Sequence, residues 1–181
     1  MNLRLQFFDY DRCLRHYKER IMNIRQAKIR GERILAKPVL LLTVIDGVEQ
    51  GHISSNHIEL DEWIEKRYNM LMRQYVRGSQ FDKITSISNP FWHLQSDGFW
   101  HLYADGIKQT VGGPTPSIAW HKEHRSVVML DEELWILLKD HEMRPLLRDY
   151  IIEHKLTNGT SRIRMAAEKL LMLTALIPFV A

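Results

Sequence analysis

The sequence predicts a single α+β domain that is mostly helical and carries one β-hairpin. Several segments repeat apolar residues every three to four positions, which is typical of amphipathic helices. Residues 86–103 are instead rich in aromatic β-formers on both sides of a glycine turn. The 181 residues are enough for one domain with an apolar core, and 45% hydrophobic with 26% charged residues is ordinary for a globular protein.

Residues 10–35 favour a helix because they contain no proline and repeat apolar residues at helical spacing. Gly31 is expected to end or interrupt it. The next run, "KPVLLLTVIDGVEQG", predicts a buried helix with Pro38 at its first position and Gly51 at its end. A buried strand is the alternative, because residues 39–44 are almost continuously apolar and short apolar runs are ambiguous.

A third helix is predicted over residues 61–76, where Trp63, Ile64, Tyr68, Leu71 and Tyr75 share one face. Two helices, a polar turn and a third helix resemble the core of many DNA-binding modules, so the predicted arrangement is winged-helix-like.

The aromatic stretch "SISNPFWHLQSDGFWHLY" predicts the β-hairpin. Its strands are residues 91–94 and 99–103, Gly98 supplies a positive φ in the turn, and Pro90 belongs to the entry turn. The simplest role of its phenylalanines and tryptophans is to anchor the hairpin to the helical core.

The remainder is predicted as a long loop over residues 104–126, then two helices and a final helix over residues 162–176. Asp131 is the expected N-cap of the first of these helices, and Pro145 separates the two. We therefore predict a recognition domain over residues 1–159 and a C-terminal helix or linker over residues 160–181.

The charge is unevenly distributed along the chain. Residues 1–37 contain ten Lys or Arg and four acids, a net charge of +6, while the rest of the chain carries −3. A basic region on a near-neutral body is typical of a face that binds a polyanion. A solvated helix surface is the plain alternative.

Cysteine content and hydropathy indicate a cytoplasmic protein. Cys13 is the one cysteine, which excludes an internal disulfide and a multi-thiolate zinc site. We see no signal peptide, and the longest apolar run, residues 170–180, is too short to span a bilayer.

Searches for catalytic patterns return nothing. There is no glycine-rich phosphate loop, no nucleophile elbow and no HNH pattern, and "DGIK" has the wrong spacing for a magnesium-dependent nuclease. His121 and His124 lie three residues apart, but a third metal ligand is not evident, so structural histidines are the preferred interpretation. We predict a chain without catalytic residues, cofactor or metal.

One combination of segments is more specific than any of its parts: "KPVLLL", then "NPFWHLQSDGFWHL", "LDEELWILLKD" and "LLRDYIIEH". It resembles the sulfur-binding domain that recognises phosphorothioate-modified DNA in McrA-like type IV restriction endonucleases, where it precedes an HNH nuclease module. The resemblance covers roughly residues 10–155. It implies double-stranded phosphorothioate DNA as the partner and an HNH nuclease as an associated module, and it leaves a homodimer open.

The resemblance also implies a sulfur cavity. Family members build it from a Tyr-Pro pair and a small residue three positions after the proline; the matching residues here are Asn89, Pro90 and His93. Sulfur is larger, softer and a poorer hydrogen-bond acceptor than oxygen, so an apolar cavity makes an oxygen lose its water without good replacement bonds. Asn89 and His93 depart from the family pattern, and both departures are polar.

The same resemblance implies cations that hold the phosphate, beginning with Lys37 directly before Pro38. The full predicted set of phosphate-binding residues is Arg25, Lys28, Arg30, Arg33, Lys37, Lys108 and Lys122. Three alternatives stay open: a winged-helix regulator without sulfur selectivity, a nuclease with an unrecognised active site, and a protein-interaction module that uses its aromatic residues.

Overall fold

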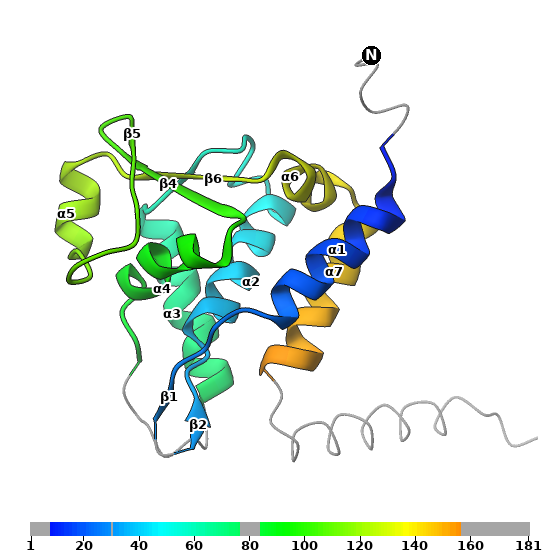
Figure 1. Cartoon of the computed structure of the whole chain (residues 1–181), viewed down its shortest axis with the longest axis horizontal. Coiled ribbons are helices and arrows are strands. Elements are labelled where there is room, and N and C mark those ends of the chain that lie inside the picture. Colours follow the sequence, from blue (N-terminus) through cyan, green and yellow to red (C-terminus); the bar gives the residue numbers. More distant parts are fainter. Residues whose placement is uncertain (1–7, 30, 77–83, 157–181) are drawn as a thin grey trace, which may run out of the picture.

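The computed structural model describes residues 8–29, 31–76 and 84–156. The helices are α1 (Tyr10–Met22), α2 (Ala36–Glu49), α3 (Glu62–Val76), α4 (Ser88–His93), α5 (Ile118–Glu123), α6 (Glu132–Lys139) and α7 (Met143–Ile151), with a 3-10 turn η2 (Leu94–Asp97) and a π-helical turn η3 (Ile152–Leu156). The strands are β1 (Lys28–Ile29), β2 (Glu32–Arg33), β3 (Ile58–Glu59), β4 (Trp100–Ala104), β5 (Ile107–Lys108) and β6 (Val127–Leu130). The predicted α+β class is confirmed (Figure 1).

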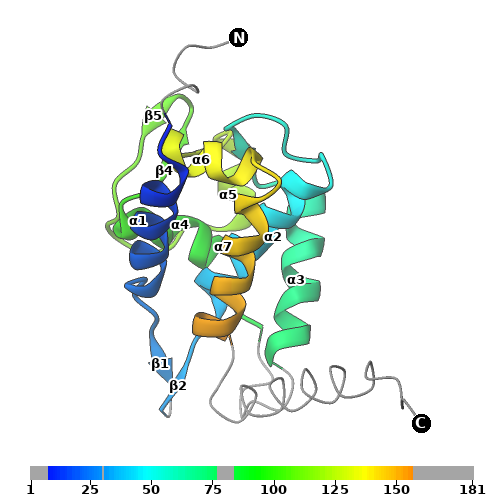
Figure 2. The same cartoon turned by 90° about the vertical axis from the view of Figure 1, so that its right-hand side faces the viewer.

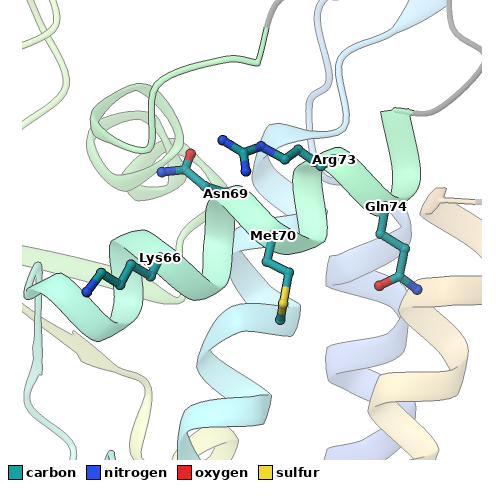
Figure 3. A pocket seen from close by; sticks show the side chains of 5 residues that line it. All are labelled: Lys66, Asn69, Met70, Arg73 and Gln74. Atoms are coloured by element: carbon teal, nitrogen blue, oxygen red, sulfur yellow. The ribbon is translucent and has the colours of Figure 1, made fainter.

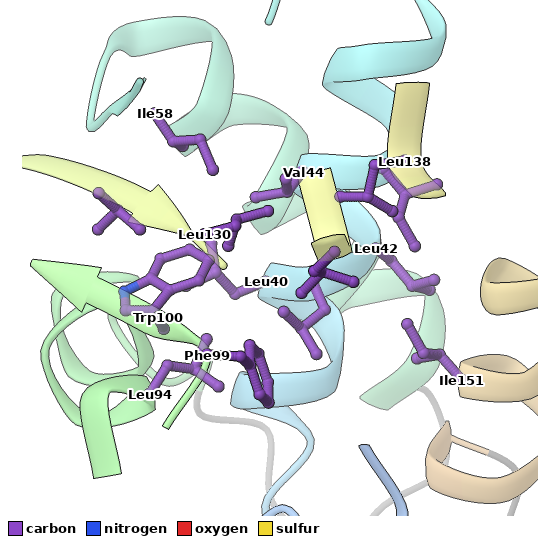
Figure 4. Packing of buried hydrophobic residues seen from close by; sticks show 14 of the residues in the cluster. Leu40, Leu42, Val44, Ile58, Leu94, Phe99, Trp100, Leu130, Leu138 and Ile151 are labelled. Atoms are coloured by element: carbon purple, nitrogen blue, oxygen red, sulfur yellow. The ribbon is translucent and has the colours of Figure 1, made fainter. Parts of the chain in front are cut away.

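Helix α2 is the centre of the core, and it packs against α3, α4, α6 and α7. Almost every side chain from Ala36 to Val48 is buried, as the continuous apolar run predicts for an enclosed helix. Leu40 and Leu42 lie between the sheet and the C-terminal helices (Figure 4). The buried-helix prediction is confirmed and the strand alternative is wrong. Gly51 follows the helix with a φ of +75°, as expected of a helix end.

A four-stranded antiparallel sheet with the order β3-β6-β4-β5 covers one side of the helices. Strand β4 alternates, with Trp100, Leu102 and Ala104 buried and the residues between them partly exposed. Trp100 donates its indole N–H to the carbonyl oxygen of Phe91 at 3.0 Å, which joins the sheet to α4.

The predicted helix over residues 10–35 is too long. Helix α1 ends at Met22, and a two-stranded ribbon follows, in which Lys28 pairs with Arg33 and Ile29 with Glu32. Gly31, with a φ of +86°, lies at the turn of this β1–β2 ribbon. The apolar repeat that favoured a longer helix ends at Ile24, where the chain leaves the core.

The predicted hairpin is wrong in its first strand. Residues 88–97 form α4 and η2, and β4 pairs instead with β5 and β6. Phe91 and Leu94 lie three residues apart, so a helix turns both into the core, where both are fully buried. Burial therefore overrides the β-propensity of the aromatic residues. Gly98 has the predicted positive φ, +82°, but it ends η2 rather than a hairpin turn.

The aromatic residues of this stretch anchor the fold, as their simplest interpretation predicts. Phe91, Trp92, Phe99 and Trp100 are all at most 6% exposed. The predicted loop over residues 104–126 is partly ordered into β5 and α5, and Ser117 caps α5 by accepting from the backbone N–H of Trp120.

Two C-terminal helices form as predicted, but the break precedes Pro145, which is the third residue of α7. Asp140 makes the break, because its Oδ1 accepts from the backbone N–H groups of Glu142 and Met143, both at 2.9 Å. The predicted helix over residues 162–176 and the 160–181 segment lie outside the described residues. Within the described part of the chain, no helix has the length and apolarity needed to cross a bilayer.

Two aspartates, one buried and one partly buried, tie elements of the fold together. Asp46 of α2, whose side chain is 1% exposed, pairs with Arg67 of α3 and Arg148 of α7. Asp131 stands at the N-cap position of α6 as predicted, but its side chain does not cap the helix. It accepts a hydrogen bond from the Tyr17 hydroxyl at 3.0 Å and shares one with His101 at 2.7 Å, so it joins α1 to β4.

Candidate nucleic-acid interface

The three residues predicted to form the sulfur cavity lie on one face of α4. Asn89 and His93 are four residues apart and Pro90 lies between them, so helical geometry places them together. Pro90 occurs in the first turn, where its missing N–H costs no helical hydrogen bond. Asn89 is exposed, His93 is half-buried and Pro90 is buried. The surface of this face is thus formed mainly by the two residues that depart from the family pattern.

A loop fastens onto this face of α4. His93 Nε2 shares a hydrogen bond of 2.8 Å with the Thr115 hydroxyl, and the Ser88 hydroxyl donates to the carbonyl oxygen of Pro116. His93 therefore has a side-chain partner within the protein. Burial, and then the nearby charge of Lys37, lower the pKa of His93, so the ring is neutral at pH 7.

Lys37, the residue before Pro38, occupies the first turn of α2 near His93. Its ammonium lies 2.6 Å from Asp97 Oδ2 and 3.3 Å from the Ser96 hydroxyl. The side chains of Lys37 and Asp97 are 13% and 5% exposed. The predicted phosphate-binding lysine therefore already has an anionic partner inside the protein.

The β1–β2 ribbon and its base carry three exposed residues of the predicted basic set. The ribbon projects from one end of the helical body, as Figures 1 and 2 show. Lys28 and Arg33 pair across it and are exposed, and Arg25 is exposed at its base. The backbone N–H of Arg25 donates to Asp97 Oδ1 at 3.2 Å, so the ribbon adjoins the Lys37 pair. Arg30 lies outside the described residues.

Lys108 and Lys122 are not brought to the ribbon. Lys108 lies on β5, at the end of the molecule opposite the ribbon in both views (Figures 1 and 2). Lys122 is exposed on α5 and lies 3.6 Å from a carboxylate oxygen of Glu65 on α3. Of the predicted phosphate-binding residues that the structure describes, most lie around the ribbon and Lys37. Lys108 and Lys122 lie away from this group.

Sequence reasoning missed a hollow of about 360 Å³ beside the Lys37 pair. It is lined by His16, Glu19, Arg20, Asn23, Arg25, Ser96 and Asp97. Ser96 and Asp97 occur in "QSDG", which the sequence marks only as a turn, and Asp97 is 60 positions from Lys37. The helical spacing of His16, Glu19, Arg20 and Asn23 was the one available signal for a polar face of α1.

A larger surface hollow, about 510 Å³, lies on the outer face of α3. Figure 3 shows its lining side chains, Lys66, Asn69, Met70, Arg73 and Gln74, all on this one helix. None of the predicted site residues borders it, and Lys66 is paired with Glu62 at 2.6 Å.

The two histidines considered as metal ligands have separate roles. His121 is 1% exposed and its Nδ1 shares a 2.9 Å hydrogen bond with the Ser126 hydroxyl, while the His124 ring stacks on Trp120. Among the residues that the structure describes, three or more His, Cys, Asp or Glu side chains do not gather in any one place as a metal site would require.

Comparison with known proteins gives the family. A family model for the ScoMcrA-like DNA sulfur-binding domain matches residues 15–161. The sulfur-binding domain of SprMcrA complexed with phosphorothioated DNA is similar in structure, with a TM-score of 0.57 and 16% identity over 80% of this chain and 86% of that one. The sulfur-binding domain of ScoMcrA complexed with phosphorothioated DNA gives a TM-score of 0.57 and 19% identity, over 79% and 90%.

A search of curated proteins gives no match. At these identities the two solved structures establish a common fold, which agrees with the helices and sheet described above. The family match is independent of them and extends from α1 to just beyond η3. Because it spans most of the described residues, this chain belongs to the family of ScoMcrA-like DNA sulfur-binding domains.

Proposed function

We propose that this domain binds double-stranded DNA that carries a backbone phosphorothioate. The observation that carries the proposal is the family match over residues 15–161. Two solved domains of the same fold are complexed with phosphorothioated DNA. In this chain, the matching face of α4 lies beside Lys37 and the base of the basic ribbon.

The sulfur would lie on the face formed by Asn89, Pro90 and His93. A neutral His93 suits this role, because an uncharged ring offers a polarisable surface without a strong donor for oxygen. The Thr115 hydrogen bond fixes the ring plane, so the surface is formed before DNA arrives. The Asn89 side chain would contribute its methylene.

The phosphates on either side would be held by the exposed cations of the ribbon, Arg25, Lys28 and Arg33. These contacts depend on the backbone charge, which modified and ordinary DNA have in common, so they give affinity without sulfur selectivity. Lys108 and Lys122 would contribute less, since they lie away from the ribbon.

We infer that the domain is a binding module without catalytic activity of its own, working with an HNH nuclease module in a type IV restriction system. A DNA ligand and the single cysteine support a cytoplasmic location.

The deciding experiment measures binding to two short duplexes that differ by one Rp phosphorothioate linkage, at near-physiological salt. The proposal predicts a preference of about tenfold or more for the modified duplex, or about 1.4 kcal/mol. Equal binding across several core sequences would instead indicate a DNA-binding regulator, and absence of DNA binding would indicate a protein-interaction module. Cleavage of the modified duplex with a divalent metal would indicate a nuclease.

Two variants locate the site within this experiment. His93→Ala removes the ring from the α4 face and should reduce the preference for modified DNA. Lys28→Ala should weaken binding to both duplexes alike and reduce the salt dependence by about one phosphate contact. Lys108→Ala is the matched control for Lys28, since both lysines are exposed on two-residue strands at opposite ends of the molecule.

A further inference from the structure

Asp97 is the carboxylate that pairs with Lys37, the predicted phosphate-binding residue near the α4 face. Its Oδ2 holds the Lys37 ammonium at 2.6 Å and its Oδ1 accepts the backbone N–H of Arg25 at 3.2 Å. Its side chain is 5% exposed, so water screens this ion pair far less than it screens a surface pair. One aspartate thus contacts both the start of α2 and the base of the ribbon.

The pair changes what Lys37 can offer to DNA. With Asp97 at 2.6 Å and the Ser96 hydroxyl at 3.3 Å, two of the three donor hydrogens of the ammonium have partners. Asp97 neutralises the charge of Lys37 within the protein. A phosphate that approaches this lysine therefore releases few of the counterions bound to the DNA. Lys37, which matches the family's phosphate-binding cation, is therefore not available to a phosphate in the free domain.

We propose that Asp97 is a specificity-determining residue, which keeps the Lys37 ammonium paired so that the site does not hold an ordinary phosphate. This inference rests on the proposed function. Oxygen accepts hydrogen bonds better than sulfur, so a free ammonium beside the α4 face would favour the unmodified backbone. The carboxylate also repels a phosphate oxygen that enters, which is a penalty directed against the wrong ligand.

Asp97 also has a structural task that the test must separate from its charge. The ribbon is closed by hydrogen bonds from Gln26 Nε2 to the Ile34 carbonyl at 3.0 Å and from the Ile34 N–H to the Ala27 carbonyl at 2.8 Å. The Asp97 bond to Arg25 attaches this closed ribbon to η2. Asp97→Asn keeps an oxygen for the Arg25 N–H, removes the charge and replaces the oxygen that faces Lys37 with an NH2 group.

The experiment measures binding of the full chain and its Asp97→Asn variant to the modified and unmodified duplexes over a salt series. We expect the variant to bind unmodified DNA at least about fivefold more tightly than the wild type, because Lys37 is released. The slope of log binding constant against log salt concentration should be steeper by about 0.9. Its preference for the modified duplex should fall. Ser96→Ala is the matched control, since it removes a neutral contact to Lys37 and should leave slope and preference unchanged.

An unchanged salt slope and an unchanged preference in a folded Asp97→Asn variant would overturn the proposal. An equal loss of affinity for both duplexes would overturn it as well. If that variant does not fold, the double variant Lys37→Met with Asp97→Asn removes the pair without changing net charge. It should bind unmodified DNA within about twofold of the wild type, whereas a slope shallower by about 0.9 would show that Lys37 holds phosphate. The slopes are measured on unmodified DNA, so they test Asp97 even if the wild type does not prefer the modified duplex.

Discussion

Asp46 and Asp97 both have buried side chains with cationic partners, but they occur in different parts of the molecule. Asp46 lies in the helical body, 1% exposed, between Arg67 of α3 and Arg148 of α7. Asp97 lies at the edge of the α4 face, 5% exposed, beside Lys37. Either carboxylate would be costly to bury alone, and each is compensated by charge and hydrogen bonds.

The choice of cation distinguishes their tasks. The planar guanidinium of Arg67 binds Asp46 through two nitrogens, Nε at 2.6 Å and Nη2 at 2.5 Å, which fixes geometry. The ammonium of Lys37 is a point charge on a flexible stem and can be redirected to another anion. The Asp46 cluster thus holds helices together, whereas the proposed task of the Asp97 pair is to control the positive charge that DNA meets.

Asp46→Asn should give the largest effect on stability. It leaves two arginines without their buried partner, and we expect the free energy of unfolding to fall by about 3–5 kcal/mol. Urea unfolding followed by circular dichroism measures this. Glu49→Gln, which removes a half-exposed partner of the same Arg148, is the control and should cost less than about 1 kcal/mol. Similar losses in both variants would contradict a special role for Asp46.

His121 gives the next largest effect, as a function of pH. Burial lowers the pKa of His121 to about 4 from an ordinary 6.5, and rings of Phe91, Trp92 and Trp120 surround it. Well above pH 6.5 the ring is neutral in both the folded and the unfolded chain. As the pH falls, the unfolded chain binds the proton first, so the free energy of unfolding should fall by about 2 kcal/mol from pH 7 to pH 5.

The measurement is urea unfolding at these two pH values for the wild type and His121→Asn. The variant should lose this part of the pH dependence, whatever its stability at pH 7. The same variant of the exposed His141 is the control and should keep the wild-type dependence. Equal pH dependence in all three proteins would show that His121 does not titrate in this way.

Lys155 differs from both aspartates, because it is a buried charge whose ammonium binds backbone carbonyl groups. Its ammonium donates to the carbonyl oxygen of Met22 at 2.8 Å, which fastens η3 to the end of α1. Lys155→Met keeps the length of the side chain but leaves that carbonyl unpaired, so we expect a loss of about 1–2 kcal/mol. Urea unfolding again measures it. A loss as large as that of Asp46→Asn would show that backbone capping matters as much as ion pairing.

Thr115→Val should have the smallest effect on stability. It removes the hydroxyl that bonds to His93, at a cost below about 1 kcal/mol in the unfolding free energy. The preference for modified DNA should nevertheless decrease, since the His93 ring loses its fixed orientation. Thr110→Val, on an exposed position of the same loop, is the control. An unchanged preference in Thr115→Val would exclude the loop from the site.

The sequence was sufficient to predict the main helices, but not the conformation of α4 or the Lys37–Asp97 pair beside it. Helices α2 and α3 follow from local periodicity and from an apolar run, which need no knowledge of the fold. The segment of α4 was misjudged because burial of Phe91 and Leu94 against α2 decides its conformation. The Lys37–Asp97 pair was beyond prediction for the same reason, because only the folded chain brings these two residues together.

The central position of α2 has a consequence for hydrogen exchange. Since α3, α4, α6 and α7 all pack on it, its amides cannot reach water unless these contacts are broken together. We therefore expect the α2 amides to exchange only through global unfolding, at rates that report the full stability of the domain. The amides of the β1–β2 ribbon lie outside this core and should exchange through local opening, which makes slower exchange in the ribbon a direct signal of bound DNA.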